Sequence, residues 1–124
     1  MLEDQKKLDF DGLRAALVAG EALSDKKGEE LTILDISELS TVCDYFVIAS
    51  GNNSRQVRSL AEEVEAKIKV EFGIAPRSIE GLNDTSWVLM DYSDFVVHIF
   101  MPETRDFYSL ERLWMDAKRI QVVS

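Results

Sequence analysis

The sequence predicts an α/β fold: a mixed five-stranded sheet flanked by helices, in the order α-β-β-α-β-β-β-α. Two segments favour this fold. Residues 44–80 place an amphipathic helical pattern between two segments typical of strands, which indicates a right-handed parallel crossover. Residues 86–100 contain two apolar runs around a short polar break, which indicates an antiparallel hairpin. The crossover supplies parallel strands and the hairpin supplies antiparallel strands, so the predicted sheet is mixed.

The first half of the chain supplies a helix and two strands. Residues 10–27 carry apolar side chains near helical spacing, and Gly28 should provide the break after them. A short strand is expected over residues 30–36. Residues 44–50, "DYFVIAS", read as a largely apolar run, which is typical of a central strand covered on both faces.

The long helix comes next, with Ser54 as the candidate N-cap and Gly73 as its end. One apolar stripe is formed by Val57, Leu60, Ala61, Val64, Ile68 and Phe72. On the opposite side, two favourable charge pairs lie four residues apart: Glu63 with Lys67, and Glu65 with Lys69. An apolar stripe with charged residues on the opposite side predicts a helix that packs its apolar face on the core and exposes the other face to water.

Three further strands are expected. Residues 74–81 predict a weaker one, and Pro76 favours an edge position or a strand start. Residues 86–92 and 94–100 predict the two strands of the hairpin, with the tight turn running through Tyr92 and Ser93.

A last helix is expected over residues 102–114, because Pro102 is acceptable in a first helical turn. One face of this helix would carry Phe107, Leu110 and Trp114. Residues 115–124 show no strong pattern, so no element is predicted there.

The totals fit one domain spanning residues 1–124. No apolar run approaches the ~20 residues that a membrane-spanning helix needs, and the N-terminus lacks the features of a secretory signal. Cys43 is the single cysteine, so no internal disulfide forms and a reducing compartment, the cytoplasm, is expected.

The net charge of −9, from 23 acidic and 14 basic residues, opposes docking on a phosphate backbone. We therefore expect no membrane partner and no direct sequence-specific nucleic-acid partner. A basic protein surface would suit this charge, since complementary potentials speed encounter. Simple solubility is the alternative explanation of the acidity.

Metal and nucleophile chemistry find little support. One histidine and one cysteine cannot supply a conventional structural zinc set. Cys43 borders an apolar strand, where a thiol is usually a buried, inert packing group rather than a partner for His98. No metal and no cofactor are predicted.

Phosphate chemistry is the more serious rival. Residues 48–57, "IASGNNSRQV", run from a buried strand through Ser50 and Gly51 into a helix N-terminus, an arrangement that attracts anions and is similar to nucleotidyltransferases. The loop lacks a Walker lysine, and no strand carries the paired carboxylates that would hold magnesium. Asp9 and Asp11 have suitable spacing but lie in a helical context. A nucleotide-binding or nucleotidyltransferase-like enzyme using the Ser50–Gly51 loop is the alternative function.

The stretch "WVLMDYSDFVVHIF", residues 87–100, holds most of the candidate residues. Asp91 and Asp94 flank the turn, where aspartate commonly accepts backbone N–H bonds. His98 shares a strand face with Val96 and Phe100, which favours a packing role over catalysis. Trp87 shares a face with Leu89 and Asp91. Large aromatic side chains at the margin of a sheet either bind another protein or are buried under a second layer of helices, and the sequence leaves both possibilities open.

Read in order, these motifs resemble the Iojap family, the ribosome silencing factors (RsfS). The matching segments are "LSDKKGEELTILDISELS", "DYFVIASGNNSRQV", "IEGLNDTSWVLMDYSDFVVHIF" and "RDFYSLERLW". The resemblance covers roughly residues 10–117, with short extensions at both ends. It implies a nucleotidyltransferase-like scaffold without enzymatic activity.

The resemblance also implies a function. Such proteins bind the large ribosomal subunit through large-subunit ribosomal protein fourteen, block association with the small subunit and repress translation under nutrient limitation. They can also form homodimers. The partner-binding residues implied by the motifs are Trp87, Leu89, Asp91, Tyr92, Asp94 and His98 in the strand-turn-strand signature, and Tyr108, Glu111 and Trp114 in the terminal helix signature.

Within that surface we expect Trp87 to be the apolar anchor and Tyr92 an amphipathic contact, with Asp91 or Asp94 pairing with Arg or Lys. Two departures from the family pattern stand out. Ser93 replaces the usual glycine, so a turn that needs positive φ would be slightly strained or would change type. Residues 101–103, "MPE", replace a more polar segment before the last helix.

Overall fold

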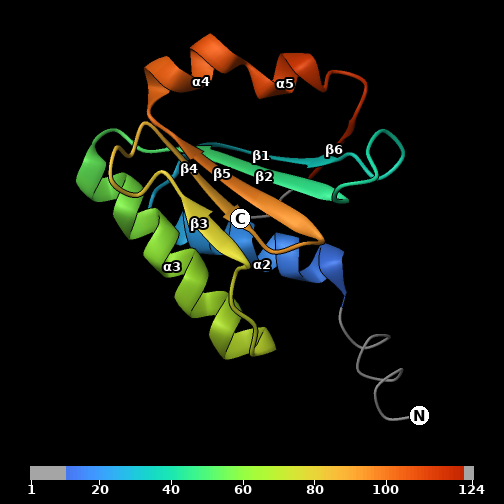
Figure 1. The fold of residues 1–124 in the computed structure, drawn as a ribbon, viewed down its shortest axis with the longest axis horizontal. Helices are drawn as coiled ribbons and strands as arrows, with labels where there is room; N and C mark the ends of the chain where they lie inside the picture. Colours follow the sequence, from blue (N-terminus) through green and yellow to red (C-terminus); the bar gives the residue numbers. More distant parts are fainter. Residues whose placement is uncertain (1–10, 122–124) are drawn as a thin grey trace.

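The computed structural model describes residues 11–121, and these form a six-stranded sheet in the order β3-β4-β5-β2-β1-β6 (Figure 1). The elements are α2 (Gly12–Asp25), β1 (Glu29–Asp35), β2 (Tyr45–Ser50), α3 (Ser54–Phe72), β3 (Ser78–Glu80), β4 (Trp87–Asp91), β5 (Phe95–Phe100), α4 (Pro102–Tyr108), α5 (Leu110–Leu113) and β6 (Lys118–Ile120). The predicted α/β class is confirmed, with one strand more than expected.

The pairing within the sheet is mixed. β2 pairs in parallel with β5 and antiparallel with β1, while β4 and β5 form the predicted antiparallel hairpin. β3 runs in the direction of β2, but β4 and β5 lie between them. The predicted crossover therefore joins parallel strands that are not neighbours. As expected, β2 is a central strand and β3 an edge strand.

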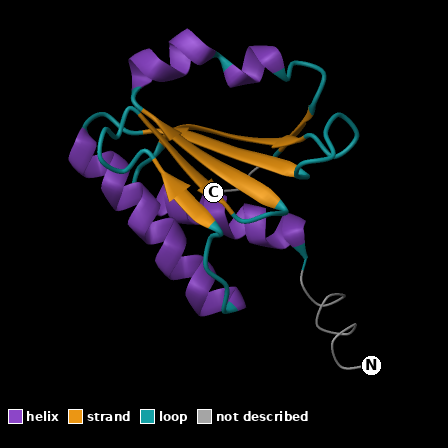
Figure 2. Cartoon of the chain, in the orientation of Figure 1, coloured by secondary structure: helices purple, strands orange, loops and turns teal. Residues whose placement is uncertain are grey.

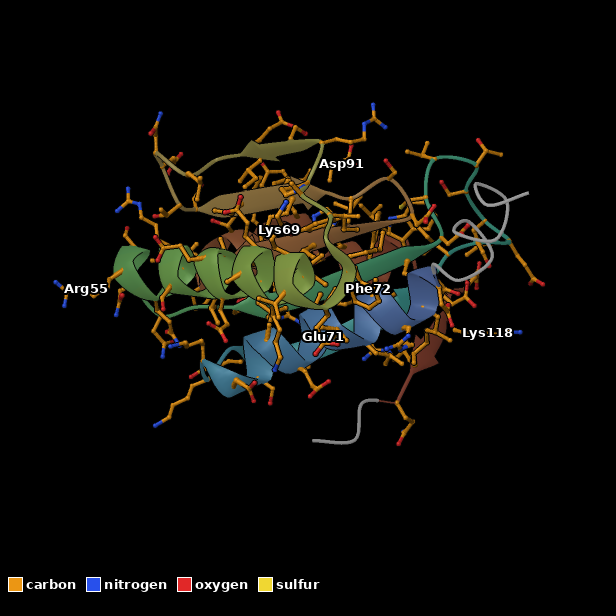
Figure 3. All side chains as sticks on the ribbon, turned by 90° about the horizontal axis from the view of Figure 1, so that it is seen from below. Arg55, Lys69, Glu71, Phe72, Asp91 and Lys118 are labelled. Atoms are coloured by element: carbon orange, nitrogen blue, oxygen red, sulfur yellow. The ribbon has the colours of Figure 1, made fainter. Side chains whose placement is uncertain are left out.

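Helices cover both faces of the sheet. α2 and α3 pack on one face, and α4 and α5 lie across the other (Figures 1 and 2). Figure 3 shows the face covered by α2 and α3, which lie next to each other in front of the sheet. Two apolar cores result, and β5, which is buried along its whole length, contributes to both.

The helix ends show which local signals were correct. Asn53, not Ser54, caps α3, because its side chain accepts a hydrogen bond from the N–H of Gln56 (2.8 Å). Gly73 ends α3 in the left-handed region (φ 71°), as predicted. Asp11 caps α2 by accepting from the N–H of Leu13 (3.0 Å).

Neither charge pair predicted along α3 closes to a salt bridge within the described residues. Lys67 instead makes an ion pair with Asp25, at the end of α2, over 2.8 Å. The pKa of Lys67 is raised mainly by its hydrogen bond with Asp25, and the charge of Glu63 adds to that rise. A partner on the neighbouring helix replaces one on the same helix, because α2 and α3 pack side by side.

The C-terminal part differs most from expectation. The predicted single helix breaks at Ser109 (φ 47°) into α4 and α5. Of its predicted apolar face, Leu110 is buried and Trp114 is half-buried, but Phe107 is 81% exposed. The patternless tail forms β6, which pairs with residues 33–35 of β1. A strand of three residues at a sheet edge is too short to show a period.

Candidate docking surface on the sheet

The hairpin sorts its side chains onto two faces. β4 alternates strictly between half-buried and buried positions. Trp87, Leu89 and Asp91 take the half-buried face, while Val88 and Met90 belong to the core beneath α2 and α3. Trp87 and Leu89 border the second core, which α5 covers only in part. The alternation predicted from the sequence is confirmed, and it leaves an accessible apolar margin on the α4–α5 side.

A hydrogen bond fixes the indole of Trp87. Its Nε1–H donates to Nδ1 of His98 over 3.0 Å. The indole also stacks on Phe100 (5.0 Å between ring centroids) and contacts Tyr108 (4.6 Å). With three neighbours, Trp87 is held in one orientation before any partner arrives, which lowers the entropic cost of binding.

His98 is a packing and orienting residue, as the sequence suggested. It is 4% exposed, and burial lowers its pKa to about 4. Because Nδ1 accepts the indole proton, the neutral ring carries its own proton on Nε2, which is buried and has no partner among the described residues. A neutral, buried imidazole holds the indole of Trp87 in place.

The turn after β4 uses Asp91 as predicted. Its carboxylate accepts a hydrogen bond from the N–H of Ser93 over 2.8 Å. Ser93 has φ 74°, which is the strained conformation expected for a residue in a glycine position. Asp94 is half-buried, and its carbonyl accepts from the N–H of Asp44 (2.8 Å). Asp91 thus has a turn role, and both aspartates lie at the end of the hairpin.

Tyr92 does not join this surface. It is 5% exposed, lies on the α2–α3 side and stacks on Phe95 with 4.8 Å between ring centroids. Burial raises the pKa of its phenol, and the hydroxyl has no partner within the described part of the chain. The expectation of an amphipathic contact is not met, because strand alternation turns Tyr92 away from Trp87.

The terminal helix residues meet the hairpin in different ways. Tyr108 is 45% exposed and lies against Trp87, so it extends the accessible margin. Trp114 packs its edge on Phe46 (5.5 Å) beneath α5. Glu111 forms a salt bridge with Arg105 over 2.9 Å. The last two therefore stabilise the layer that carries Tyr108.

Arg105 is the residue that sequence reasoning missed. It is 5% exposed, and its guanidinium donates to the carbonyls of Glu29 (3.3 Å) and Glu30 (2.6 Å) and to Oγ of Ser50 (2.8 Å). These bonds and the Glu111 salt bridge tie α4 to the ends of β1 and β2. Helical spacing gave no signal for this role, because Arg105 lies away from the predicted face of Phe107, Leu110 and Trp114.

The Ser50–Gly51 loop is already occupied by the protein's own groups. The Ser50 hydroxyl accepts from Arg105, and the N–H of Gly51 donates to the carbonyl of Phe100 (2.9 Å). The N–H of Asn52 donates to Oε1 of Gln56 (2.7 Å). A phosphate site needs free N–H groups, so this geometry counts against a nucleotide loop. Asp9 lies outside the described residues.

Other chemical sites are similarly closed. Burial raises the pKa of Cys43 to about 11, so its thiol stays protonated and inert. Within residues 11–121, no group of three His, Cys, Asp or Glu side chains is arranged to hold a metal. None of the helices described is both long and apolar enough to cross a membrane.

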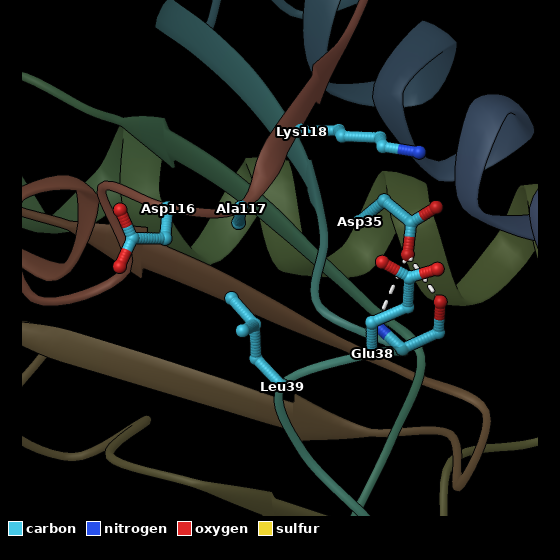
Figure 4. A pocket seen from close by; sticks show the side chains of 7 residues that line it. Asp35, Glu38, Leu39, Asp116, Ala117 and Lys118 are labelled. Carbon is cyan, nitrogen blue, oxygen red and sulfur yellow. Dashed lines mark hydrogen bonds between the residues drawn. The ribbon is translucent and has the colours of Figure 1, made fainter.

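A pocket of about 80 Å³ lies beside Asp35, between the β1–β2 loop and the start of β6 (Figure 4). Small-molecule sites usually enclose about 300 Å³ or more. The carboxylate of Asp35 already accepts hydrogen bonds from the hydroxyl (2.6 Å) and N–H (3.0 Å) of Ser37, which lower its pKa. The pocket is therefore a surface hollow with its carboxylate already engaged.

Fold and surface together define a class: a small mixed α/β domain with a preorganised aromatic margin suited to binding another macromolecule. Residues 11–124 match the family model RsfS, described as "Ribosomal silencing factor during starvation". The chain belongs to this family, the non-enzymatic ribosome-binding regulators that its motifs resembled.

Several relatives and solved structures are similar to this chain. A ribosomal silencing factor RsfS of Bacillus subtilis is 41% identical over 100 residues, which cover 81% of this chain and 84% of that protein. A ribosomal silencing factor RsfS of Zymomonas mobilis is 37% identical over 110 residues, which cover 89% of this chain and 82% of that protein. A crystal structure of a Chromobacterium violaceum protein superposes with a TM-score of 0.81 at 34% identity, covering 93% and 94% of the two chains.

Proposed function

We propose that this protein is a ribosome silencing factor. It binds the large ribosomal subunit through large-subunit ribosomal protein fourteen, blocks association with the small subunit and represses translation when nutrients are limiting. The observation that carries the proposal is the RsfS family match over residues 11–124, supported by relatives that bear the name ribosomal silencing factor.

The proposed contact surface is the accessible margin of the hairpin. Trp87 and Leu89 supply apolar area, and Asp91 supplies a carboxylate at the end of the hairpin. Asp94, also at that end, has its side chain against Gly12 at the start of α2. Tyr108 extends this margin onto α4. Tryptophan and tyrosine held in place by their neighbours are the residue types that dominate binding energy at protein interfaces.

The remaining predicted residues support that margin without forming it. His98 orients the indole of Trp87, Trp114 packs under α5, and Glu111 holds Arg105 in place. Replacing any of them is expected to weaken ribosome binding by displacing Trp87 or Tyr108, not by removing a direct contact.

Electrostatics favour a basic ribosomal protein over ribosomal RNA. The chain carries a net charge of −9, so RNA phosphates repel it while a basic protein surface attracts it. RNA repulsion would also limit where the domain settles on the subunit. Association should therefore be fastest at low salt.

Three further expectations belong to the proposal. The chain acts as one domain in the cytoplasm, and it self-associates as a homodimer. Exposed apolar side chains such as Leu39 and Val42, in the β1–β2 loop, support self-association. Light scattering over a range of protein concentrations tests the homodimer.

Co-sedimentation with isolated large subunits tests the function. The protein should pellet with large subunits and reduce their joining to small subunits. Trp87→Ala should weaken binding by about 2 kcal/mol, as a hot-spot residue does. Val70→Ala is a matched control, because Val70 is 85% exposed on α3, across the sheet. Protein that stays in the supernatant while large subunits pellet would refute the proposal.

A further inference from the structure

Phe107 is an aromatic side chain without a structural task of its own. It is 81% exposed on α4, where helical spacing had predicted a buried face. α4 itself is well anchored, because Arg105 is buried and bonded to β1, β2 and Glu111. Turning Phe107 inward would require α4 to rotate and break these bonds of Arg105.

Phe107 ends a continuous row of rings that starts in the sheet. Phe100 contacts Trp87 (5.0 Å between centroids), Trp87 contacts Tyr108 (4.6 Å), and Tyr108 contacts Phe107 edge-on (5.1 Å). Exposure increases outward along the row, from buried Phe100 through half-buried Trp87 to Phe107. The row makes Phe107 continuous with the docking surface proposed above.

The charges beside Phe107 are acidic. Glu103 lies one helical turn before Phe107, on the same face of α4, whereas Asp106, the preceding residue, lines a hollow with Arg105 and Arg112. Both carboxylates are exposed, whereas the cation between them in sequence, Arg105, is buried and already paired with Glu111. An open aromatic face beside an exposed carboxylate attracts a cation through both the ring quadrupole and the negative charge.

We propose that Phe107, with Glu103 one helical turn away, receives an arginine side chain from the ribosomal protein to which this domain binds. A guanidinium suits the site because it stacks on a ring while its N–H groups reach carboxylates. A second copy of this chain suits it poorly, because its matching face would bring Glu103 against the same acid. The inference deepens the proposed function and rests on it.

The test measures affinity for isolated large subunits with three variants and one control. Phe107→Ala should weaken binding about tenfold, within the range of cation–π contacts that lose water. Phe107→Leu keeps apolar area but has no ring, and should stay nearly as weak. Glu103→Gln should weaken binding at low salt and match wild type at high salt. Val70→Ala, which removes similarly exposed apolar area on α3, should bind like wild type.

The outcomes separate the two proposals. If wild-type protein does not bind large subunits, the proposed function fails and this inference falls with it. If wild type binds and Phe107→Ala binds equally well, the inference alone is overturned. Full recovery by Phe107→Leu would show a plain apolar contact instead of an arginine site. A change in self-association without a change in ribosome binding would assign Phe107 to the homodimer and also overturn it.

Discussion

Acidification should destabilise this protein through His98. In the folded chain burial lowers the His98 pKa from its ordinary 6.5 to about 4. The unfolded state therefore binds the proton more tightly, so the stabilisation is complete above pH 6.5 and is lost as pH falls toward 4. The full loss is about 3 kcal/mol, and roughly 2 kcal/mol of it falls between pH 7 and pH 5.

Urea unfolding at pH 7, 6 and 5 measures this effect. His98 is the only histidine in the chain, so His98→Gln is a clean comparison in which every carboxylate is retained. The pH dependence of wild type should exceed that of His98→Gln by about 2 kcal/mol over this interval. Proton NMR of the folded protein gives an independent check. A His98 ring that titrates near pH 6.5 in the folded state would refute the reasoning.

Three other perturbations test separate features. Arg105→Met should lower the free energy of unfolding by about 3 kcal/mol in thermal denaturation, because it leaves strand carbonyls and Glu111 without their buried partner; a loss below 1 kcal/mol would mean these bonds contribute little. Ser93→Gly should raise stability by about 0.5 kcal/mol, since glycine accepts φ 74° without strain, and a lower midpoint in urea would contradict this. Cys43 should react with a thiol reagent at pH 8 far more slowly in native protein than in urea, because its pKa is raised to about 11, and equal rates would show that it is exposed.

The elements with a strong period were predicted correctly. α3 has a six-residue apolar stripe ending at a glycine, and the hairpin has two apolar runs about a turn, so both show in the sequence. The break between α4 and α5 depends on one residue, Ser109 at φ 47°, and serine is no signal for that conformation. β6 exists because β1 offers it a free edge, which is tertiary information.

The sequence indicated most of the residues of the docking surface but not how their side chains are arranged. Alternation along β4 correctly placed Trp87 and Leu89 on one face, whereas Tyr92 was expected at the surface because it lies within the family motif, and it is buried on the opposite face. The bond from Trp87 to His98 depends on the register of β4 against β5, which places Leu89 opposite His98. Register of this kind is set by the turn and by core packing, which the sequence encodes only indirectly.

The bonds of Arg105 have a consequence for how the chain folds. Its guanidinium joins residues separated by 76, 75 and 55 positions along the sequence. Contacts between such distant residues carry a large loop-closure cost and form late. A chain still emerging from synthesis, ending before residue 105, would leave the carbonyls of Glu29 and Glu30 without this donor. The layer carrying Tyr108 is then secured only when nearly the whole polypeptide is available, which links completion of the chain to competence for binding.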